Sequence, residues 1–234
     1  MKSTKVAILC GGKGVRLQPL TEQIPKPLIT LGGKPIIEHL IELYARQNFD
    51  EFFLCVGHLG NKIEAYFKDK NQFNIKFVDS GTEATPLQRI YDLRDLFEDQ
   101  MLISYGDTIA DINFKEFLDV HKSSNALVTI LTAPFVSPFG LVTWHEDDCR
   151  LASFEEKPVF DYYVGYFIMK KEAFEYITPE MLSQPLGLIS LFNAFINEKK
   201  LAGYKHHGPK ITFNTDHELM HAEKLILDFY TVKE

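Results

Sequence analysis

Short apolar runs alternate with helix-like segments over the first half of the chain, and this alternation limits the fold more than any other feature. Four runs rich in aliphatic and β-branched residues predict buried strands: residues 6–10, 51–56, 74–78 and 101–105. Three segments between them carry apolar residues at helical spacing: residues 35–47, 61–68 and 87–97. The pattern predicts an α/β fold, with a Rossmann-like, mostly parallel central sheet flanked by helices.

The second half of the chain has a different pattern. Four strand-like runs follow one another, mostly without long helices between them: residues 127–132, 140–144, 151–154 and 162–169. We expect these runs to add antiparallel strands that cover the ligand side of the sheet. The remaining segments predict helices at 171–176 and 189–199, a short strand at 202–205 and a closing helix at 216–230. Because no repeat or linker interrupts residues 1–234, we predict a single domain with two halves, about 1–115 and about 116–234.

Charge and cysteine content narrow the class of protein. The formal net charge of −7 argues against nucleic acid as a partner, because nucleic-acid-binding surfaces are basic. Nucleotides are not excluded, since they need only a local cationic pocket. The three cysteines are too few for a disulfide framework, and Cys10 and Cys55 lie in apolar runs. No signal peptide or apolar run of about 18 residues is present, so we expect a cytoplasmic protein without a membrane partner. The sequence leaves open whether it forms a homo-oligomer.

The segment after the first predicted strand, residues 11–27, combines a tight turn with positive charge. Its first four residues include Gly11, Gly12 and Gly14. Glycine lets backbone N–H groups approach a ligand closely, and such groups form anion-binding concavities. Three cations belong to the same segment: Lys13, Arg16 and Lys26. The segment therefore predicts a phosphate site. It is neither a dinucleotide-binding turn, which needs glycine in place of Leu17, nor a Walker A loop, which needs Ser or Thr in place of Gly14.

The ordered residues of this segment closely resemble the G-G-x-G-T-R-L…P-K-P signature of the sugar-phosphate nucleotidylyltransferases. One position departs, because Val15 stands where the family usually has Thr. The resemblance implies the fold of nucleotide-diphospho-sugar transferases, with the antiparallel strands on the acceptor side, and a reaction that joins a phosphomonoester to an NTP and releases pyrophosphate. It implies catalytic roles for Arg16, Lys26 and Asp107. It implies nucleotide contacts at Leu9, Gly11, Gly12, Gly14, Val15, Arg16 and Gly81.

A divalent cation suits this reaction, because two polyanions must approach each other, and Mg²⁺ prefers oxygen ligands. Asp107 follows the predicted strand 101–105 directly, and the resemblance gives it the family's metal-ligand role. Residues 213–219 resemble the family's closing segment, where a second ligand precedes the last helix. We align Asn214 with that ligand and keep Asp216 as the alternative. The resemblance therefore implies a Mg²⁺ site made by Asp107 and Asn214.

The acceptor half, about residues 116–234, carries a second part of the resemblance. The sequence at 155–158 resembles an E-K-P segment whose Glu and Lys face the acceptor. The resemblance implies that Glu156 binds sugar hydroxyls and that Lys157 binds the acceptor phosphate. Two glycines, Gly140 and Gly165, match glycines that line the acceptor pocket.

Several segments of the nucleotide half, about residues 1–115, are similar to the glucose-1-phosphate cytidylyltransferase branch of this family. They are residues 55–60, 79–81, 89–90, 105–107 and 110–111. CTP is therefore the favoured NTP, and the resemblance implies sugar nucleotide formation for polysaccharide biosynthesis. Two departures are residues 85–90, which replace a Thr-Gly-Gly-Arg-Ile segment, and residues 162–164, which replace an Asn-bearing approach to Gly165. The acceptor is accordingly a sugar 1-phosphate or, as an alternative, a non-sugar phosphomonoester.

Two further hypotheses compete with this interpretation. Residues 217–221, His-Glu-Leu-Met-His, match the H-E-x-x-H motif of zinc metalloproteases, which places two histidines on one helix face. Only thirteen residues follow His221, which leaves little room for a further zinc ligand. The other hypothesis is a nucleotide sensor of the same fold that has lost catalysis, which the replacement at Val15 permits.

Overall fold

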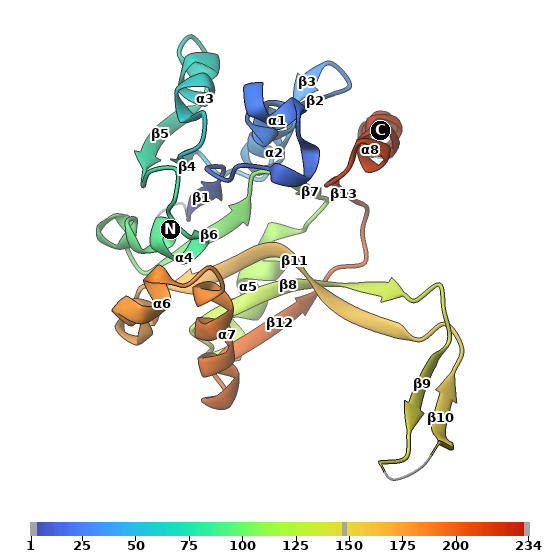
Figure 1. Cartoon of the computed structure of the whole chain (residues 1–234). Helices are drawn as coiled ribbons and strands as arrows, with labels where there is room; N and C mark the ends of the chain where they lie inside the picture. The colour runs from blue at the N-terminus through green and yellow to red at the C-terminus, as the bar shows by residue number, and fades with distance from the viewer. Residues whose placement is uncertain (1–3, 147–148, 232–234) are drawn as a thin grey trace.

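The computed structural model describes residues 4–146 and 149–231, which include a seven-stranded sheet in the order β12-β8-β11-β6-β1-β4-β5 (Figure 1). The strands from the first half are β1 (Lys5–Leu9), β4 (Glu51–Val56), β5 (Asn74–Asp79) and β6 (Gln100–Tyr105). Those from the second half are β8 (Val128–Val136), β11 (Val159–Lys170) and β12 (Leu201–Lys205). Only β11 runs against its neighbours β6 and β8, and the other adjacent pairs are parallel. The prediction of a mostly parallel α/β sheet is confirmed.

Helices cover both faces of this sheet, because the side chains of each strand alternate between them. In β1, Val6 and Ile8 pack in one core with helices α2 (Ile36–Ala45), α3 (Gly60–Phe67) and α5 (Phe114–Ser124). Ala7 and Leu9 pack in the opposite core with α4 (Pro86–Tyr91) and α7 (Gly187–Asn197). Burial on both faces explains why the inner strands β1, β4 and β6 are nearly continuous apolar runs, whereas the edge strand β5 alternates exposed and half-buried residues over most of its length. No helix within the described ranges has both the length and the apolar character to cross a membrane.

The helix predicted at 87–97 is shorter than expected. Helix α4 ends at Tyr91 and is followed by a separate 3₁₀ turn, η3 (Arg94–Leu96). The reason is local, since Leu93 and Leu96 donate to carbonyls three residues earlier and tighten the chain out of the α-helical repeat. The segment at 171–176 is likewise a 3₁₀ helix, η4 (Lys171–Tyr176). The sequence reading missed α5 and the short helix α6 (Pro179–Ser183).

A third core joins segments that are distant in sequence. It contains residues of helix α8 (Asp216–Thr231) together with Leu31 of β2 (Thr30–Leu31), a strand that pairs with β3 (Lys34–Pro35). It also contains Ile109 of β7 (Thr108–Ala110) and Ile211 of β13 (Lys210–Thr212), which pair directly in an antiparallel ladder. This core fixes the C-terminal segment beside the end of β6.

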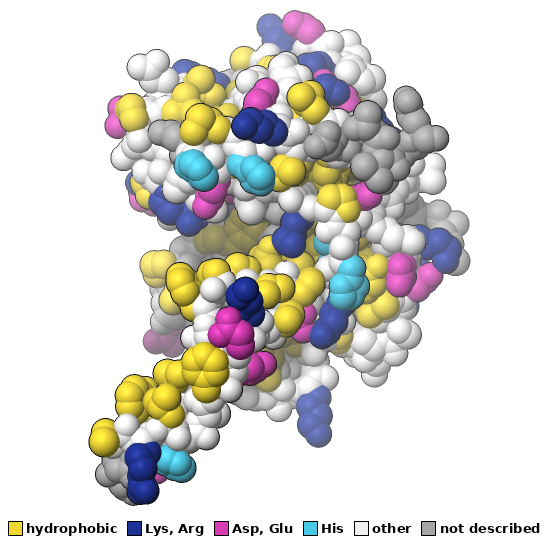
Figure 2. All heavy atoms as spheres, turned by 90° about the vertical axis from the view of Figure 1, so that its right-hand side faces the viewer, with side chains coloured by type: hydrophobic (Ala, Val, Ile, Leu, Met, Phe, Trp, Pro, Cys, Tyr) yellow, Lys and Arg dark blue, Asp and Glu magenta, His cyan; other side chains and the backbone are white. Residues whose placement is uncertain are grey.

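The strands β9 (Leu141–Trp144) and β10 (Leu151–Glu155) pair with each other and project from the body as an arm (Figure 1). We expected these strands to cover the ligand side of the sheet, and instead they lie outside the seven-stranded sheet. Large apolar side chains are exposed along the arm, including Phe139, Trp144 and Phe154 at 73%, 61% and 65% (Figure 2). The described residues of β9 and β10 therefore belong to none of the three cores, and the two strands pair only with each other. A two-stranded hairpin normally needs a third strand or a packed helix to be stable.

Candidate active site

A cavity of about 300 Å³ lies at the carboxyl end of the parallel strands, where the order of the strands reverses. The chain passes from β1 to β4 and β5 on one side, and then returns to β6 on the other side of β1. The loops after β1 and β6 both border the cavity, with Gly11 and Gly12 from the first and Gly106 and Asp107 from the second. In open α/β sheets this is the place where ligands bind.

Most of the residues predicted to bind nucleotide or to catalyse transfer line this cavity. They are Leu9, Gly11, Gly12, Gly14, Val15, Arg16, Lys26, Asp107 and Asn214. Gly81 is the predicted nucleotide residue that does not line it. The side chain of Arg16 is exposed, and Val15, at the position of the family's Thr, is 60% exposed. The structure thus brings together residues that are up to about two hundred positions apart in the sequence.

The turn at Gly14 shapes the phosphate-loop side of the cavity. Gly14 has a φ of +62°, which L side chains rarely adopt, and its carbonyl accepts hydrogen bonds from the Leu17 amide and the Thr21 hydroxyl, both at 2.9 Å. A Cβ atom at this position would also lie 2.9 Å from the Thr21 side chain. The glycine therefore permits both the backbone conformation and the close return of the chain.

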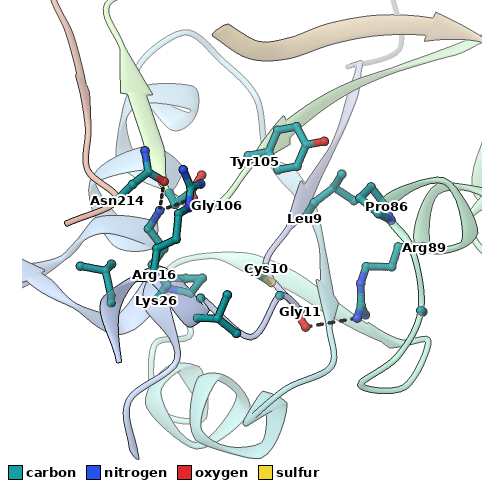
Figure 3. A pocket seen from close by; sticks show the side chains of 17 residues that line it. Leu9, Cys10, Gly11, Arg16, Lys26, Pro86, Arg89, Tyr105, Gly106 and Asn214 are labelled. Carbon is teal, nitrogen blue, oxygen red and sulfur yellow. Dashed lines mark hydrogen bonds and ion pairs between the residues drawn. The ribbon is translucent and has the colours of Figure 1, made fainter. Parts of the chain in front are cut away.

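Arg89 is a cavity residue to which the sequence analysis assigned no role. Its side chain is buried, and its guanidinium donates to the carbonyls of Val56 and of Gly81, the latter at 2.8 Å. It also donates to the carbonyl of Gly11 at 3.2 Å (Figure 3). These carbonyls lie at or just beyond the ends of β4, β1 and β5, so one cation ties three loops together. A side chain at Gly11 would overlap the guanidinium. The available signal was a cation interrupting the apolar face of the predicted helix, next to Ile90.

Lys26, Asp107 and Asn214 meet on the other side of the cavity. The Lys26 Nζ lies 2.6 Å from Asp107 Oδ2 and 3.1 Å from Asn214 Oδ1 (Figure 3). Lys26 is 8% exposed, and its Nζ also lies 5.3 Å from the centroid of the Phe213 ring. The buried ammonium is thus compensated by one carboxylate, one amide oxygen and one aromatic face.

Backbone pairing explains why Asp107 and Asn214 converge. Thr108 of β7 pairs with Thr212 of β13, which brings the residues just outside this ladder to the same edge. The backbone amide of Asn214 donates to Glu218 Oε2 at 2.6 Å and so fixes the chain at the start of α8. The backbone positions of Asp107 and Asn214 are therefore set by strand pairing and a local cap, and their approach does not depend on the Lys26 contact alone.

The pair of oxygens fits a hard divalent cation. Both oxygens already point at one positively charged nitrogen, which acts as a stand-in cation, and carboxylate and amide oxygens are the ligands that Mg²⁺ accepts. Across residues 4–146 and 149–231, no group of three His, Cys, Asp or Glu side chains could hold a metal ion. Two protein oxygens would need further ligands, which phosphate oxygens supply. The side chain of Asp216, the alternative ligand, lies outside the described part of the chain.

The zinc hypothesis also requires a third protein ligand. His217 and His221 lie on α8 as predicted, without a third ligand among the side chains that the structure describes. The glutamate between them, Glu218, accepts the hydrogen bond from the Asn214 amide. The glutamate of the motif therefore has a structural partner.

A second cavity, of about 430 Å³, adjoins the first and shares Arg16, Tyr105 and Asp107 with it. Gly165, which the resemblance assigns to the acceptor pocket, lines this second cavity. Gly140, Glu156 and Lys157 do not line either of these two cavities. Gly140 and Glu156 lie against each other at the base of the arm, where a Cβ atom on Gly140 would be 3.2 Å from Glu156 Oε2. The predicted acceptor residues are thus divided between a cavity wall and the arm.

The second cavity contains a cation that the sequence analysis missed. Lys210 lines it, with its Nζ 5.5 Å from the centroid of the Tyr162 ring. Nothing in the local sequence distinguishes Lys210 from a surface lysine. Tyr105, in the wall shared by the two cavities, is neutral, because burial and the neighbouring Asp107 raise the pKa of its phenol to about 12.

Comparisons with known proteins show the family to which this chain belongs. The nucleotidyl transferase family model matches residues 5–208. A probable glucose-1-phosphate cytidylyltransferase of Bacillus subtilis (strain 168) is 29% identical over 250 aligned residues, covering 94% of this chain and 95% of that protein. The UTP–glucose-1-phosphate uridylyltransferase of Synechocystis sp. is 30% identical, covering 74% of this chain and 50% of that protein. The crystal structure of HddC from Yersinia pseudotuberculosis complexed with GMP-PN has a TM-score of 0.73 at 19% identity, covering 95% of this chain and 99% of that one, and supports the fold.

Proposed function

The chain belongs to the nucleotidyl transferase family, as a sugar-phosphate nucleotidyltransferase, and we propose that it transfers the cytidylyl group of CTP to a sugar 1-phosphate. The acceptor phosphate oxygen attacks the α-phosphorus, the bond to the β-phosphate oxygen breaks, and pyrophosphate leaves. The observation that carries this proposal is the convergence of Lys26, Asp107 and Asn214 in the cavity formed by the glycine-rich loop.

The two adjoining cavities suggest how the substrates are arranged. We assign the first cavity to the nucleotide, because glycine backbone and Arg16 line it, and the second to the acceptor, because Gly165 lines it. Arg16 belongs to both walls and would bind the β- and γ-phosphates as they depart. Asp107 stands at the junction of the two cavities, where the reacting phosphates would meet. We keep the proposed division into a nucleotide half, about residues 1–115, and an acceptor half, about 116–234, with the two halves meeting at the cavities, since each cavity has residues of both.

The charges in the site match the demands of the transition state. Lys26 would neutralise the phosphates at the reacting centre, and Asp107 and Asn214 would hold Mg²⁺. When bound, Mg²⁺ supplies positive charge that reduces repulsion between the substrates and offsets the charge on pyrophosphate. Arg89 does not contact the reacting phosphates in this proposal. Its guanidinium positions the loops that form the nucleotide cavity, by donating hydrogen bonds to their carbonyls. Positioning and electrostatics together are what phosphoryl-group chemistry requires.

The arm residues Glu156 and Lys157 remain assigned to the acceptor on the strength of the E-K-P resemblance, with Gly140 supporting Glu156. CTP is favoured by the similar segments of the cytidylyltransferase branch and by the likeness to the Bacillus subtilis protein. The uridylyltransferase among the relatives makes UTP the main competitor. A non-sugar phosphomonoester is the second candidate acceptor, because residues 162–164 depart from the branch pattern close to Gly165.

A substrate matrix tests the proposal directly. Each of the four NTPs is incubated with glucose 1-phosphate, other hexose 1-phosphates and phosphocholine in the presence of Mg²⁺, and pyrophosphate is measured. We expect the fastest release with CTP and a hexose 1-phosphate, and loss of release in Asp107→Asn. Fastest release with UTP would overturn the assignment of CTP as the nucleotide. Fastest release with phosphocholine would overturn the assignment of a sugar 1-phosphate as the acceptor. Nucleotide binding without pyrophosphate from any pair would favour a sensor.

A further inference from the structure

Lys26 occupies the place where a divalent cation would sit. We propose that Lys26 holds the two metal ligands in the nucleotide-free protein and must release them before a divalent cation binds. This inference rests on the proposed function, because it takes Asp107 and Asn214 as the metal ligands. It assigns Lys26 a second task, in which a single ammonium couples metal binding to nucleotide binding.

The geometry of the three side chains makes the two cations competitors. The Lys26 Nζ is 2.6 Å from Asp107 Oδ2 and 3.1 Å from Asn214 Oδ1, so it uses the same oxygens that a metal would use. A divalent cation bound to both oxygens would have to share them with the ammonium. Two positive charges this close repel strongly in a partly buried site, where water screens them poorly. Metal binding to Asp107 and Asn214 therefore requires Lys26 to move.

The surroundings of Lys26 show where it can go. Its side chain is 10% exposed and lines the cavity assigned to the nucleotide, so its accessible side faces that cavity. Without a nucleotide, moving the ammonium into the cavity would cost it a charge-assisted hydrogen bond. With a triphosphate present, phosphate oxygens would replace Asp107 as its acceptors. Nucleotide would thus free Asp107 at the same time as it brings further oxygens for the metal.

This inference differs from a simpler explanation of weak metal binding. If the nucleotide-free protein binds metal weakly only because it offers two oxygens, the removal of Lys26 leaves the affinity unchanged. If Lys26 competes, its removal strengthens metal binding even though a catalytic residue has been lost. The two explanations therefore predict different signs of effect for the same variant.

The experiment is a titration of the nucleotide-free protein with Mn²⁺, in which electron paramagnetic resonance reports the unbound ion. We expect Lys26→Met to bind Mn²⁺ about tenfold more tightly than the unmodified protein, which equals about 1.4 kcal/mol. Lys13→Met is the matched control, because Lys13 belongs to the same loop and its Nζ pairs with the exposed Glu83 at 2.6 Å. This control removes the same charge and is expected to leave the Mn²⁺ affinity within about twofold, since exposed charges interact weakly.

Further variants and conditions make the test decisive. Lys26→Gln repeats the measurement if Lys26→Met unfolds, as judged by circular dichroism. Asp107→Asn combined with Lys26→Met should abolish the gain, and a gain that persists would place the ion elsewhere. With a non-hydrolysable CTP analogue bound, the advantage of Lys26→Met should shrink, because Lys26 has already left Asp107. Equal or weaker Mn²⁺ binding in both Lys26 variants overturns the inference. A gain in Mn²⁺ affinity with no pyrophosphate release from the unmodified protein would instead overturn the proposed function alone.

Discussion

The loop at residues 11–27 and the arm at residues 140–157 both carry residues that motif resemblance assigned to the reaction, but the structure treats them differently. In the loop, Lys26 is buried and bound to Asp107 and Asn214. In the arm, Lys157 is exposed and makes no hydrogen bond or ion pair with the side chains and backbone that the structure describes. The difference lies in the scaffold, because β1 and β6 anchor the loop region inside a buried parallel sheet, whereas the arm is a two-stranded ladder.

This comparison separates two kinds of inference from a motif. A motif that directly follows a buried parallel strand begins at the carboxyl edge of the sheet. Its side chains therefore lie close to residues that follow the neighbouring strands. A motif on a projecting two-stranded ladder is positioned only relative to the other strand of that ladder. The arm's place relative to the acceptor cavity is therefore not fixed by the sheet, and its residues need tests of their own.

The strongest test of the loop region is Asp107→Asn. Loss of the charge removes the partner of Lys26 and one metal ligand together, and we expect the rate of pyrophosphate release to fall at least about 10³-fold, or ~4 kcal/mol. Asp119→Asn is the matched control, because Asp119 is a carboxylate of α5 that pairs with Lys115 on the same helix at 2.8 Å. Activity of Asp107→Asn within tenfold of the control would remove Asp107 from the centre of the site.

The next largest effect is expected for Arg16→Ala. Arg16 lines both cavities and is exposed, so it can bind phosphate without supporting the fold. Removing one charged contact from a transition state costs about 2–4 kcal/mol, which predicts a fall in kcat of roughly 30- to 10³-fold with an unchanged melting temperature. Lys13→Ala, on the same loop, should retain most activity. If both variants behave alike, loop charge in general matters and Arg16 has no specific role.

A substitution of Arg89 tests whether the loop region depends on the hydrogen bonds that this guanidinium donates to the loop carbonyls. Arg89→Met keeps much of the apolar stem but removes the guanidinium donor from three backbone carbonyls, of which that of Gly11 also accepts from the His58 amide at 3.1 Å. We expect the free energy of unfolding to drop by about 3 kcal/mol, because unsatisfied buried acceptors are costly. The KM for the nucleotide should rise more than the KM for the acceptor, since the loops concerned form the first cavity. Chemical denaturation and steady-state kinetics measure the two effects, and an unchanged nucleotide KM would limit Arg89 to a role in stability.

The fold was more accessible from the sequence than the site was. The parallel strands were predicted because each is an apolar run closed by glycine or polar residues, which is a local signal. The reversed direction of β11 depends on long-range pairing with β6 and β8, and no local pattern specifies it. Helix α5 was missed because its fully buried face is short, with Phe114, Phe117 and His121.

Within the site, the resemblance brought Lys26, Asp107 and Asn214 together on the basis of residue order. It could not reveal Arg89, because the partners of Arg89 are backbone carbonyls of three loops and carry no side-chain signature. Lys210 was missed for a similar reason, since it reaches the second cavity through the pairing of β13 with β7. Long-range pairing therefore determines the contacts that a motif does not contain.

The smallest expected effect concerns the arm, and it decides whether the comparison holds. If Lys157 binds the acceptor phosphate, Lys157→Ala should raise the acceptor KM by about tenfold, since a single partly solvated charge contact contributes roughly 1–1.5 kcal/mol. The nucleotide KM should stay the same, because Lys157 does not line the nucleotide cavity. Steady-state kinetics with each substrate varied in turn measures both constants.

Lys210→Ala provides the comparison for this arm variant, because Lys210 lines the acceptor cavity while Lys157 lies on the projecting ladder. A raised acceptor KM in both variants would mean that the arm comes to the acceptor during turnover, so its position is set by substrate and not by the sheet. An effect in Lys210→Ala alone would remove Lys157 from the acceptor site and assign the phosphate to the cavity wall. Loss of nucleotide affinity in Lys157→Ala would contradict the division of the two cavities itself. The two lysines carry the same charge, so the difference between them measures what the scaffold beneath each one contributes.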